Sequence, residues 1–404
     1  MKKFMLMAAT VLMTLAANAQ NPDGLKQVLA SKSYSEANEM MKTLAESMTN
    51  EEKAKAYNKL VDLAIADNDK AEKKALEAQI AKNDEEMNKQ NAKKAKAAYN
   101  ALKMGRECHK ADMQPNAKGK VSPKFQKNNA ARLMIVRNSL VNAGLDSYNS
   151  KNYADAQKYF GSYVEARQDP LFEKTDFSQE KGYGQIAYYA ALAAYFNKDA
   201  KKCSKYADIS LNAGEEEVIA DAITVKLSAL EEQAKEGAID TTKFVKEVKK
   251  VYTAYPNNET VFGKIVGLLD ESGDKAGAKK LLDERLAQNP NDAMANAYVG
   301  QGAQAEEKYD DAIAAYEKAL AAKPDFIHVK LNLGVCYLNR AAKSLDANTD
   351  ARGNLKADAK DGVIAQFQKA KSILEEVKAA DPDRLQVNWS YPLERVNYAL
   401  DNIQ

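Results

Sequence analysis

The sequence has few of the side chains that perform most enzyme chemistry. Among 404 residues there are two histidines, three cysteines and one tryptophan. A metal site needs several ligands at a workable spacing, and His109 and His328 are far apart along the chain. Cys108 is adjacent to His109, but a cysteine nucleophile needs a base that a third group holds in position. We therefore expect no metal, no cofactor and no enzymatic activity.

Proline, glycine and cysteine are all scarce. The chain has nine prolines and eighteen glycines, whereas alanine, lysine, glutamate and leucine, which favour helix, are abundant. Cys108, Cys203 and Cys336 are odd in number and widely spaced, which is not the pattern of a dense disulfide framework. The composition predicts an all-α protein that is stabilised by packing.

The sequence also lacks an excess of charge of one sign. It has 59 Lys and Arg against 57 Asp and Glu, and removal of an N-terminal segment that contains Lys2 and Lys3 would leave 57 of each. Electrostatic capture of nucleic acid or of an anionic membrane needs an excess of basic residues on one face. We therefore expect no nucleic-acid partner.

The N-terminal residues MKKFMLMAATVLMTLAANAQ have the pattern of a secretory signal peptide. Two lysines precede an apolar run over 4–17, and the small-x-small pattern at 17–19 predicts cleavage after Ala19. The run is too short to cross a bilayer as a helix, although a retained anchor is the alternative. No cysteine directly follows it, so lipid anchoring of the bacterial type is not expected. We predict a signal peptide over 1–19 and an exported mature chain, periplasmic or secreted, without a membrane span.

Three prolines recur at a fixed distance in the second half of the chain. Pro256, Pro290 and Pro324 are each separated by 34 residues. Before the last of them the sequence predicts two amphipathic helices, over about 292–306 and 309–322, and the proline ends the second. A period of this length indicates a repeated helical hairpin.

The segment that ends at Pro324 resembles the tetratricopeptide repeat, a 34-residue helix–turn–helix unit. Its matching residues are Gly300, Tyr309, Ala312, Tyr316, Ala319 and Pro324. A second copy matches at Gly144, Tyr153, Ala156, Phe160 and Tyr163, and a third at Leu333, Gly334, Tyr337, Ala370, Leu374, Val377 and Pro382. Pro324 and Pro382 are 58 residues apart, which is one repeat of 34 plus an insertion of 24. The resemblance implies a helical-hairpin solenoid, and with the signal peptide an exported bacterial type.

The remaining sequence is divided by its composition. Residues 20–105 are predicted to form an N-terminal helical region, and the stretch 106–130, which contains Pro and Gly, is predicted to be a loop. Residues 131–404 are expected to form the repeat array, with the insertion near 346–361 lengthening one hairpin and ending in a polar loop. Cys203 and Cys336 fall at repeat positions that take small packed side chains, so we interpret them as buried thiols.

The resemblance also implies where a partner would bind. Stacked repeats form a concave face, and in this family the first helix of each repeat lines it. The corresponding positions here are Tyr148, Tyr188, Tyr195, His328, Leu331, Val335 and Leu338. They would either form an apolar, aromatic groove for a helix or an extended peptide, or pack into the core. The lysine and asparagine positions with which some members hold a C-terminal carboxylate are occupied by other residues.

Three hypotheses of function follow. The first is an exported, non-catalytic scaffold or adaptor that holds a protein or peptide partner in the cell envelope. The second is a structural subunit of an envelope assembly or secretion complex. The third is a glycan-binding protein, which the twenty tyrosines allow but which a single tryptophan, Trp389, makes a weak candidate.

Overall fold

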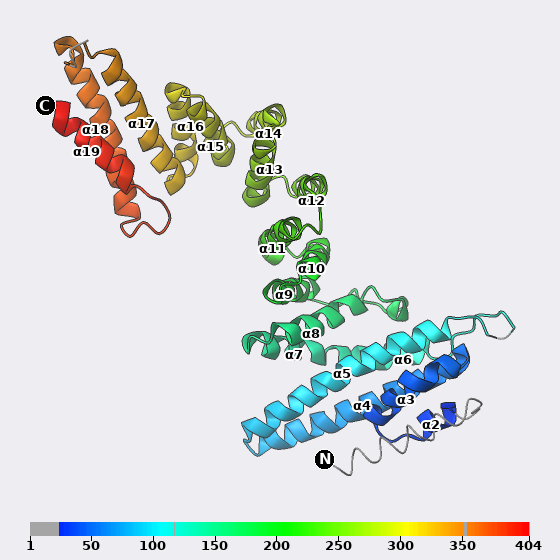
Figure 1. Ribbon diagram of the computed structural model, residues 1–404. Helices are drawn as coiled ribbons and strands as arrows, with labels where there is room; N and C mark the ends of the chain where they lie inside the picture. Colours follow the sequence, from blue (N-terminus) through cyan, green and yellow to red (C-terminus); the bar gives the residue numbers. More distant parts are fainter. Residues whose placement is uncertain (1–23, 117, 351–353, 404) are drawn as a thin grey trace. The chain divides into compact units, whose positions relative to one another are not determined.

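The computed structural model describes residues 24–116, 118–350 and 354–403, and it is shown in Figure 1. The predicted signal peptide over 1–19 lies outside these residues. The chain divides into two compact units, the first extending to Glu247 and the second beginning at Val248. This division falls within α12 (Thr241–Ala254), inside the region that the sequence predicts as one array. Each unit is described by itself.

The first unit is built from helices that follow one another along the chain. They are α2 (Gly24–Ala30), α3 (Tyr34–Leu44), η1 (Ala45–Ser47), α4 (Asn50–Ile80), α5 (Asp84–Asp112), α6 (Gln126–Arg137), α7 (Ser139–Asn149), α8 (Tyr153–Ala166), η2 (Pro170–Phe172), α9 (Tyr183–Phe196), α10 (Ala200–Ala213) and α11 (Glu216–Lys235).

Helices α4 and α5 form a long hairpin near the start of this unit (Figure 1). Thr49 and Glu52 cap the beginning of α4 reciprocally, each side chain accepting a backbone N–H of the other, which satisfies donors that a helix start leaves free. Alanine is the commonest buried residue of the two helices, so the helices approach closely.

The predicted loop limits of 106–130 are too wide. Helix α5 continues to Asp112 and α6 begins at Gln126. Gly105 therefore lies inside α5. A Cβ atom at this position would lie 2.3 Å from a methyl of Leu133, so glycine allows α6 to approach α5 closely. The Asp112 carboxylate then accepts the backbone N–H groups of Lys124 at 2.6 Å and Phe125 at 2.8 Å, which ties the loop to the end of α5.

The second unit continues the succession of helical hairpins. After α12 come α13 (Glu259–Glu271), α14 (Lys275–Gln288), α15 (Ala293–Ala305), α16 (Tyr309–Ala322), α17 (Ile327–Ala347), α18 (Ala357–Ala380) and α19 (Ser390–Ile403). The bounds of α15 and α16 agree with the predicted helices to within one residue at each end. The predicted insertion lengthens α17 and α18, and the described part of the turn between them contains a bridge between Thr349 and Leu355.

A glycine-to-side-chain contact repeats in the hairpins and explains the spacing of the small residues. A Cβ atom on Gly144 would lie 2.5 Å from the ring of Phe160, and one on Gly300 would lie 2.5 Å from the ring of Tyr316. In both hairpins the partner follows sixteen residues later. Gly334 makes the same close approach to Leu374, at 2.8 Å, forty residues later, which is sixteen plus the insertion of 24. The close contacts therefore follow the predicted repeat frame, with 24 further residues between the two partners of the last hairpin.

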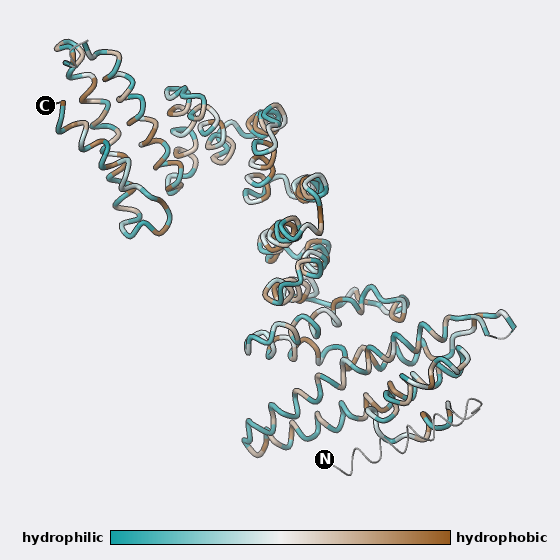
Figure 2. The backbone as a smooth tube through the Cα atoms, viewed as in Figure 1, coloured by the Kyte–Doolittle hydropathy of each residue, from teal (hydrophilic) through white to brown (hydrophobic). Residues whose placement is uncertain are grey.

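The core of each unit is apolar, and apolar positions recur between polar ones along the helices (Figure 2). Apart from the bridge between Thr349 and Leu355, the described residues contain helices, turns and loops, so the predicted all-α hairpin fold is confirmed. Even α4, the longest described helix with 31 residues, carries too many charges to cross a bilayer, and no other described helix qualifies.

Candidate partner-binding surfaces

The residues predicted to line one groove belong to different units. Tyr148 lies on α7, and Tyr188 and Tyr195 lie on α9, all in the first unit. His328, Leu331, Val335 and Leu338 lie on α17 in the second unit. They are therefore described as two surfaces: the aromatic surface of the first unit and the groove of the second unit.

The aromatic surface begins with four rings in mutual contact. The ring of Phe196 stacks on that of Tyr153, with centroids 4.9 Å apart and planes at 24°. Tyr148 contacts both rings edge-on, at 5.5 Å from Tyr153 and 6.1 Å from Phe196. Tyr195 contacts Phe196 edge-on at 5.5 Å. Aromatic pairs of this geometry contribute stability in addition to that from burial, so the four rings hold one another in place.

The sequence of α9 explains why its tyrosines are available. Ala187, Ala190, Ala191 and Ala194 occupy one stripe at helical spacing and are buried, so α10 packs closely against that side. Tyr188 and Tyr195 are seven residues apart and share another face. Tyr188 is partly buried, whereas Tyr195 and Phe196 at the end of the helix are 46% and 45% exposed.

A cavity of about 400 Å³ opens beside this exposed end. Its lining consists of Tyr195, Phe196, Lys198, Ala200, Ala229, Glu232 and Glu236. The aromatic side comes from α9, the alanines from α10 and α11, and the two carboxylates from the end of α11. Burial first, and the Asp221 carboxylate of α11 second, raise the pKa of Tyr188 above its ordinary value. The tyrosines of α9 therefore have acidic residues of α11 as neighbours.

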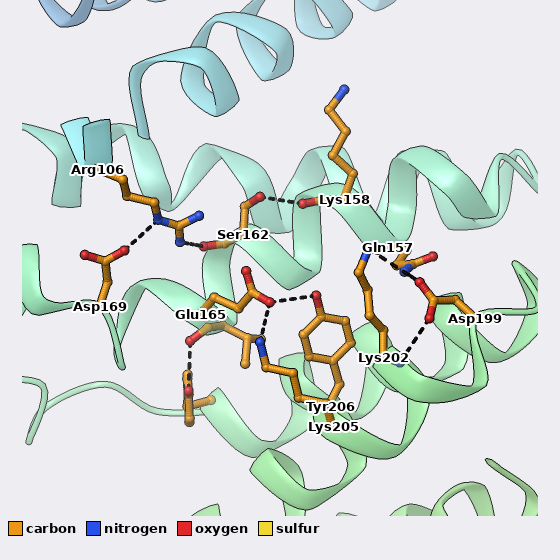
Figure 3. A network of polar contacts seen from close by, with 12 residues as sticks. Arg106, Gln157, Lys158, Ser162, Glu165, Asp169, Asp199, Lys202, Lys205 and Tyr206 are labelled. Carbon is orange, nitrogen blue, oxygen red and sulfur yellow. Dashed lines mark hydrogen bonds and ion pairs between the residues drawn. The ribbon is translucent and has the colours of Figure 1, made fainter. Parts of the chain in front are cut away.

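A network of polar contacts holds α8 and α10 together in the first unit (Figure 3). Glu165 of α8 accepts hydrogen bonds from the ammonium of Lys205 at 2.6 Å and from the hydroxyl of Tyr206 at 3.2 Å. Gln157 of α8 donates to Asp199 before α10 at 2.7 Å. Burial, and then Glu165, raise the pKa of Tyr206, so this phenol stays protonated and acts as a structural donor.

The same network reaches back to α5. The Arg106 guanidinium lies 2.8 Å from the carboxylate of Asp169 and donates to the carbonyl of Ser162 at 3.4 Å (Figure 3). Gly161 is required beside it, because a Cβ atom there would lie 2.2 Å from the hydroxyl oxygen of Tyr206. These charged groups contact one another and do not converge on an open site. Their contacts hold α5, α8 and α10 together.

The groove of the second unit is a larger cavity, of about 900 Å³. Helix α17 lines it with Leu338, Ala342 and Leu345, and α18 contributes Phe367. The other wall is α19, whose Tyr391 and Tyr398 are 65% and 72% exposed. The polar lining includes Asp346, Asn354, Lys360, Glu394, Arg395 and Asn402. An apolar floor with aromatic and polar walls is the usual character of a ligand or peptide groove.

The structure brings one of the four predicted α17 residues to this groove. Leu338 lines it, although the residue is nearly all buried and also belongs to the core. Leu331 and Val335 are partly buried, and His328 is exposed, but all three lie outside the lining. Sequence reasoning missed Ala342 and Leu345, which follow Leu338 at helical spacing. It also missed Tyr391 and Tyr398, which are seven residues apart on α19.

The three cysteines are buried, and the two histidines belong to different units. Cys108, Cys203 and Cys336 are free and buried, and burial raises the pKa of each thiol to about 12. His109 is buried in the first unit and His328 belongs to the second. Among the residues that the structure describes, no three His, Cys, Asp or Glu side chains are grouped as metal ligands.

Trp389 does not form a sugar-binding platform. Its ring is buried in the core of the second unit, and its indole N–H donates to the carbonyl of Asp381 at 2.7 Å. A glycan could not stack on this ring in the described fold.

Comparison with known proteins identifies a repeat segment and a set of distant structures. The tetratricopeptide-repeat family model matches residues 303–344, which extend from the end of α15 into α17. No curated protein matches the chain.

Several solved structures are similar in part. A TPR-repeat protein from Bacteroides fragilis is 20% identical with a TM-score of 0.31, covering 65% of this chain and 98% of that one. The C-terminal part of a TPR-repeat-containing protein from Cytophaga hutchinsonii is 14% identical with a TM-score of 0.34, covering 61% and 97%. Human IFIT1, in a dimer with m7Gppp-AAAA, is 15% identical with a TM-score of 0.36, covering 76% and 64%. Similarity at this level carries no argument about function.

Proposed function

We propose that this chain is an exported, non-catalytic scaffold that holds a protein or peptide partner in the cell envelope through the groove of the second unit. The observation that carries the proposal is the groove itself, about 900 Å³ of space between α17, α18 and α19. The matched repeat segment 303–344 contributes the first part of one of its walls, and the repeat family that it resembles is associated with protein and peptide binding.

The chemistry of the groove fits an amphipathic helix or an extended peptide with apolar anchors. Leu345 and Phe367 offer an apolar floor, and Tyr391 and Tyr398 form a wall whose rings can be buried by a partner. Tyrosine is enriched among the residues that dominate binding energy, because it buries a large rigid ring and keeps a polar tip. Arg395 and Glu394 supply hydrogen-bonding groups at the rim, which can fix the orientation of a partner.

Crosslinking and affinity capture from envelope extracts test this function. The mature chain should capture a defined partner, and Tyr391→Ala with Tyr398→Ala should reduce its recovery at least tenfold, because truncation of a dominant contact costs 2 kcal/mol or more, about thirtyfold in affinity. Leu385→Ala is the matched control, since Leu385 is exposed in the second unit but lies outside the groove. An unchanged set of partners in the tyrosine variant would contradict the proposal.

Export is tested separately by the N-terminus of the protein from cells. We expect the mature chain to begin at Gln20, since the small residues at 17 and 19 precede that position. Deletion of residues 1–19 should keep the protein in the cytoplasm. Recovery of an intact Met1 from the envelope fraction would favour a retained anchor.

A structural role in an envelope assembly or secretion complex is the second candidate. It is favoured by Leu76 and Ile80, which are 56% and 76% exposed at the end of α4 and offer an apolar contact. Leu76→Asp with Ile80→Asp should then release the protein from a large complex in native gels, whereas the groove variant should not. Co-migration that depends on Tyr391 and Tyr398 alone would count against this candidate.

A further inference from the structure

We propose that the cavity at the end of α9 and α11 in the first unit binds the cationic side chain of a lysine or arginine in a partner polypeptide. This site is separate from the groove of the second unit, and the inference does not depend on that groove.

Exposed and braced rings provide the first part of the site. Tyr195 and Phe196 line the cavity and are both nearly half exposed. Phe196 is held by stacking on Tyr153 and by the edge of Tyr148, so its position is set before a ligand arrives. A cation within about 6 Å of such a ring is attracted by the negative face of the π-system.

Two carboxylates provide the second part. Glu232 and Glu236 line the same cavity from the end of α11. Glu232 contacts Lys235 of its own helix at 3.4 Å, whereas Glu236 has no ion-pair partner among the described residues. Helices α9 and α11 both end beside the cavity, and α10 begins there at Ala200; the two negative macrodipole ends favour a cation and are opposed by one positive end.

The remaining lining selects against other ligands. Ala200 and Ala229 are buried and form an apolar floor, and Lys198 is the one basic side chain of the lining. Two carboxylates against one ammonium leave the lining with one net negative charge. An anionic ligand would be repelled by the carboxylates.

The source of the cation follows from the continuation of the surface. Seven residues before Tyr195 on α9 is Tyr188, and α11, which packs against α9, carries the exposed Asp221; after burial, this carboxylate raises the pKa of Tyr188, so an aromatic ring and an acid occur on these two helices a second time. Seven residues of helix rise about 10 Å. In a polyproline II peptide, side chains three residues apart share a face at a separation of about 9 Å. The two lysines of a Lys-x-x-Lys peptide match this spacing, whereas a free amine would occupy only one of the two positions.

Fluorescence anisotropy with labelled peptides tests the site on the mature chain. The probe is an acetylated Gly-Lys-Pro-Pro-Lys-Gly peptide, and the matched peptides carry glutamate or Nε-acetyl-lysine in place of both lysines. We expect binding of the lysine peptide alone, weakened by salt. Tyr195→Ala, and separately Glu232→Gln with Glu236→Gln, should each weaken it about two- to fivefold. Lys198→Gln should strengthen it, because the competing ammonium is removed.

The control for the second unit is Tyr398→Ala, which should leave the affinity for this peptide unchanged. Unaltered helical circular dichroism and urea midpoints of the variants show that they remain folded. Equal binding of the acetyl-lysine peptide, no effect of the two glutamine substitutions, or no binding of the lysine peptide at millimolar concentration would each overturn the proposal. Loss of binding in Tyr398→Ala would assign the peptide to the groove and overturn it as well.

Discussion

The two units of the molecule differ in what they bury. Of fifteen polar or charged side chains that are buried among the described residues, thirteen lie in the first unit and two, Asn296 and Asp381, in the second. The first unit is less than twice as long as the second, so length does not explain the difference. Complementary volumes pack the hairpins of both units, and the first unit adds more buried polar contacts, some of which fix irregular segments.

The largest of these polar contacts surrounds Arg137 in the first unit. Its side chain is fully buried, its Nε donates to the carbonyl of Tyr163 at 2.9 Å, and its guanidinium lies 3.7 Å from the centre of the Tyr163 ring. Glu180 pairs with Arg137 and accepts the Tyr163 hydroxyl at 2.6 Å. Because Glu180 belongs to the segment between α8 and α9, this cluster anchors that segment to α6 and α8.

The single tryptophan allows the unfolding of the two units to be followed separately. Trp389 lies in the second unit, so its fluorescence reports the unfolding of that unit, while far-ultraviolet circular dichroism reports the helices of both.

The largest effect is expected in the first unit. Glu180→Ala leaves the Arg137 charge buried without its partner, which typically lowers the free energy of unfolding by about 3–5 kcal/mol. Urea unfolding should show an earlier transition by circular dichroism and an unchanged transition by Trp389 fluorescence.

The control for Glu180 is Glu39→Ala, which removes an exposed pair with Lys42 in the same unit. Such a pair contributes no more than about 1 kcal/mol. If the two substitutions destabilised the first unit equally, buried polar contacts would not be what distinguishes it.

An intermediate effect is expected from packing in the second unit. Gly300→Ala adds a methyl group 2.5 Å from the ring of Tyr316, and the hydroxyl of Tyr316 is held by Gln304 at 2.7 Å, which limits how far the ring can move. Overpacking of this kind costs about 1–3 kcal/mol. The Trp389 transition should move to lower urea.

Gly302 provides the matched control on the same helix. A Cβ atom there would have no neighbour within 4 Å, so Gly302→Ala should stabilise α15 by about 0.5–1 kcal/mol through helix propensity. If Gly300→Ala lowers and Gly302→Ala raises the free energy of unfolding, the space available at each position, and not the loss of glycine itself, determines the stability of these hairpins. Loss of stability in both would contradict it.

The smallest effect is a dependence on pH in the second unit. The Asp381 carboxylate accepts the backbone N–H groups of Val387, Gln386 and Leu385, each at 2.9 Å. These bonds, that of Val387 first, lower its pKa in the folded chain below the ordinary value of 3.8. A lowered folded pKa means that the stabilisation is complete well above 3.8 and is lost as the pH falls through the folded value.

The Trp389 urea midpoint should therefore fall between pH 6 and pH 3, and Asp381→Asn should lower the midpoint at pH 6 and reduce its further fall. The comparison variant is Asp283→Asn, whose carboxylate is exposed on α14. An acid response in Asp381→Asn as large as in the unaltered protein would assign it to other groups.

Particular residues show how far the sequence could be interpreted without the structure. The spacing of Gly300 and Tyr316 predicted a close contact between two helices, and the 24-residue excess before Pro382 predicted the lengthened pair α17 and α18. These features are local or repeat at a fixed period, so the sequence displays them directly. The predicted limit at residue 105 was wrong, because Gly105 lies inside α5 and makes room for Leu133 of α6, a contact between helices that the sequence does not display.

The binding surfaces were less predictable for a related reason. Leu338 was among the predicted residues, but the groove continues along the inserted part of α17 and is completed by α19, where the repeat pattern has ended. Tyr148 and Tyr195 were predicted to line a partner groove or to pack into the core, and Glu232 and Glu236 join Tyr195 only because α11 ends beside α9. Contacts between helices so distant in sequence have no fixed spacing.

The sequence alone determined that the chain folds into paired helices, because apolar periodicity, small residues and prolines act over one or two turns or recur at a set interval. Tertiary structure decided where space is left open and which charges border it. A cavity depends on how completely neighbouring helices fill the volume between them, and that is a property of their packed arrangement and not of any one segment.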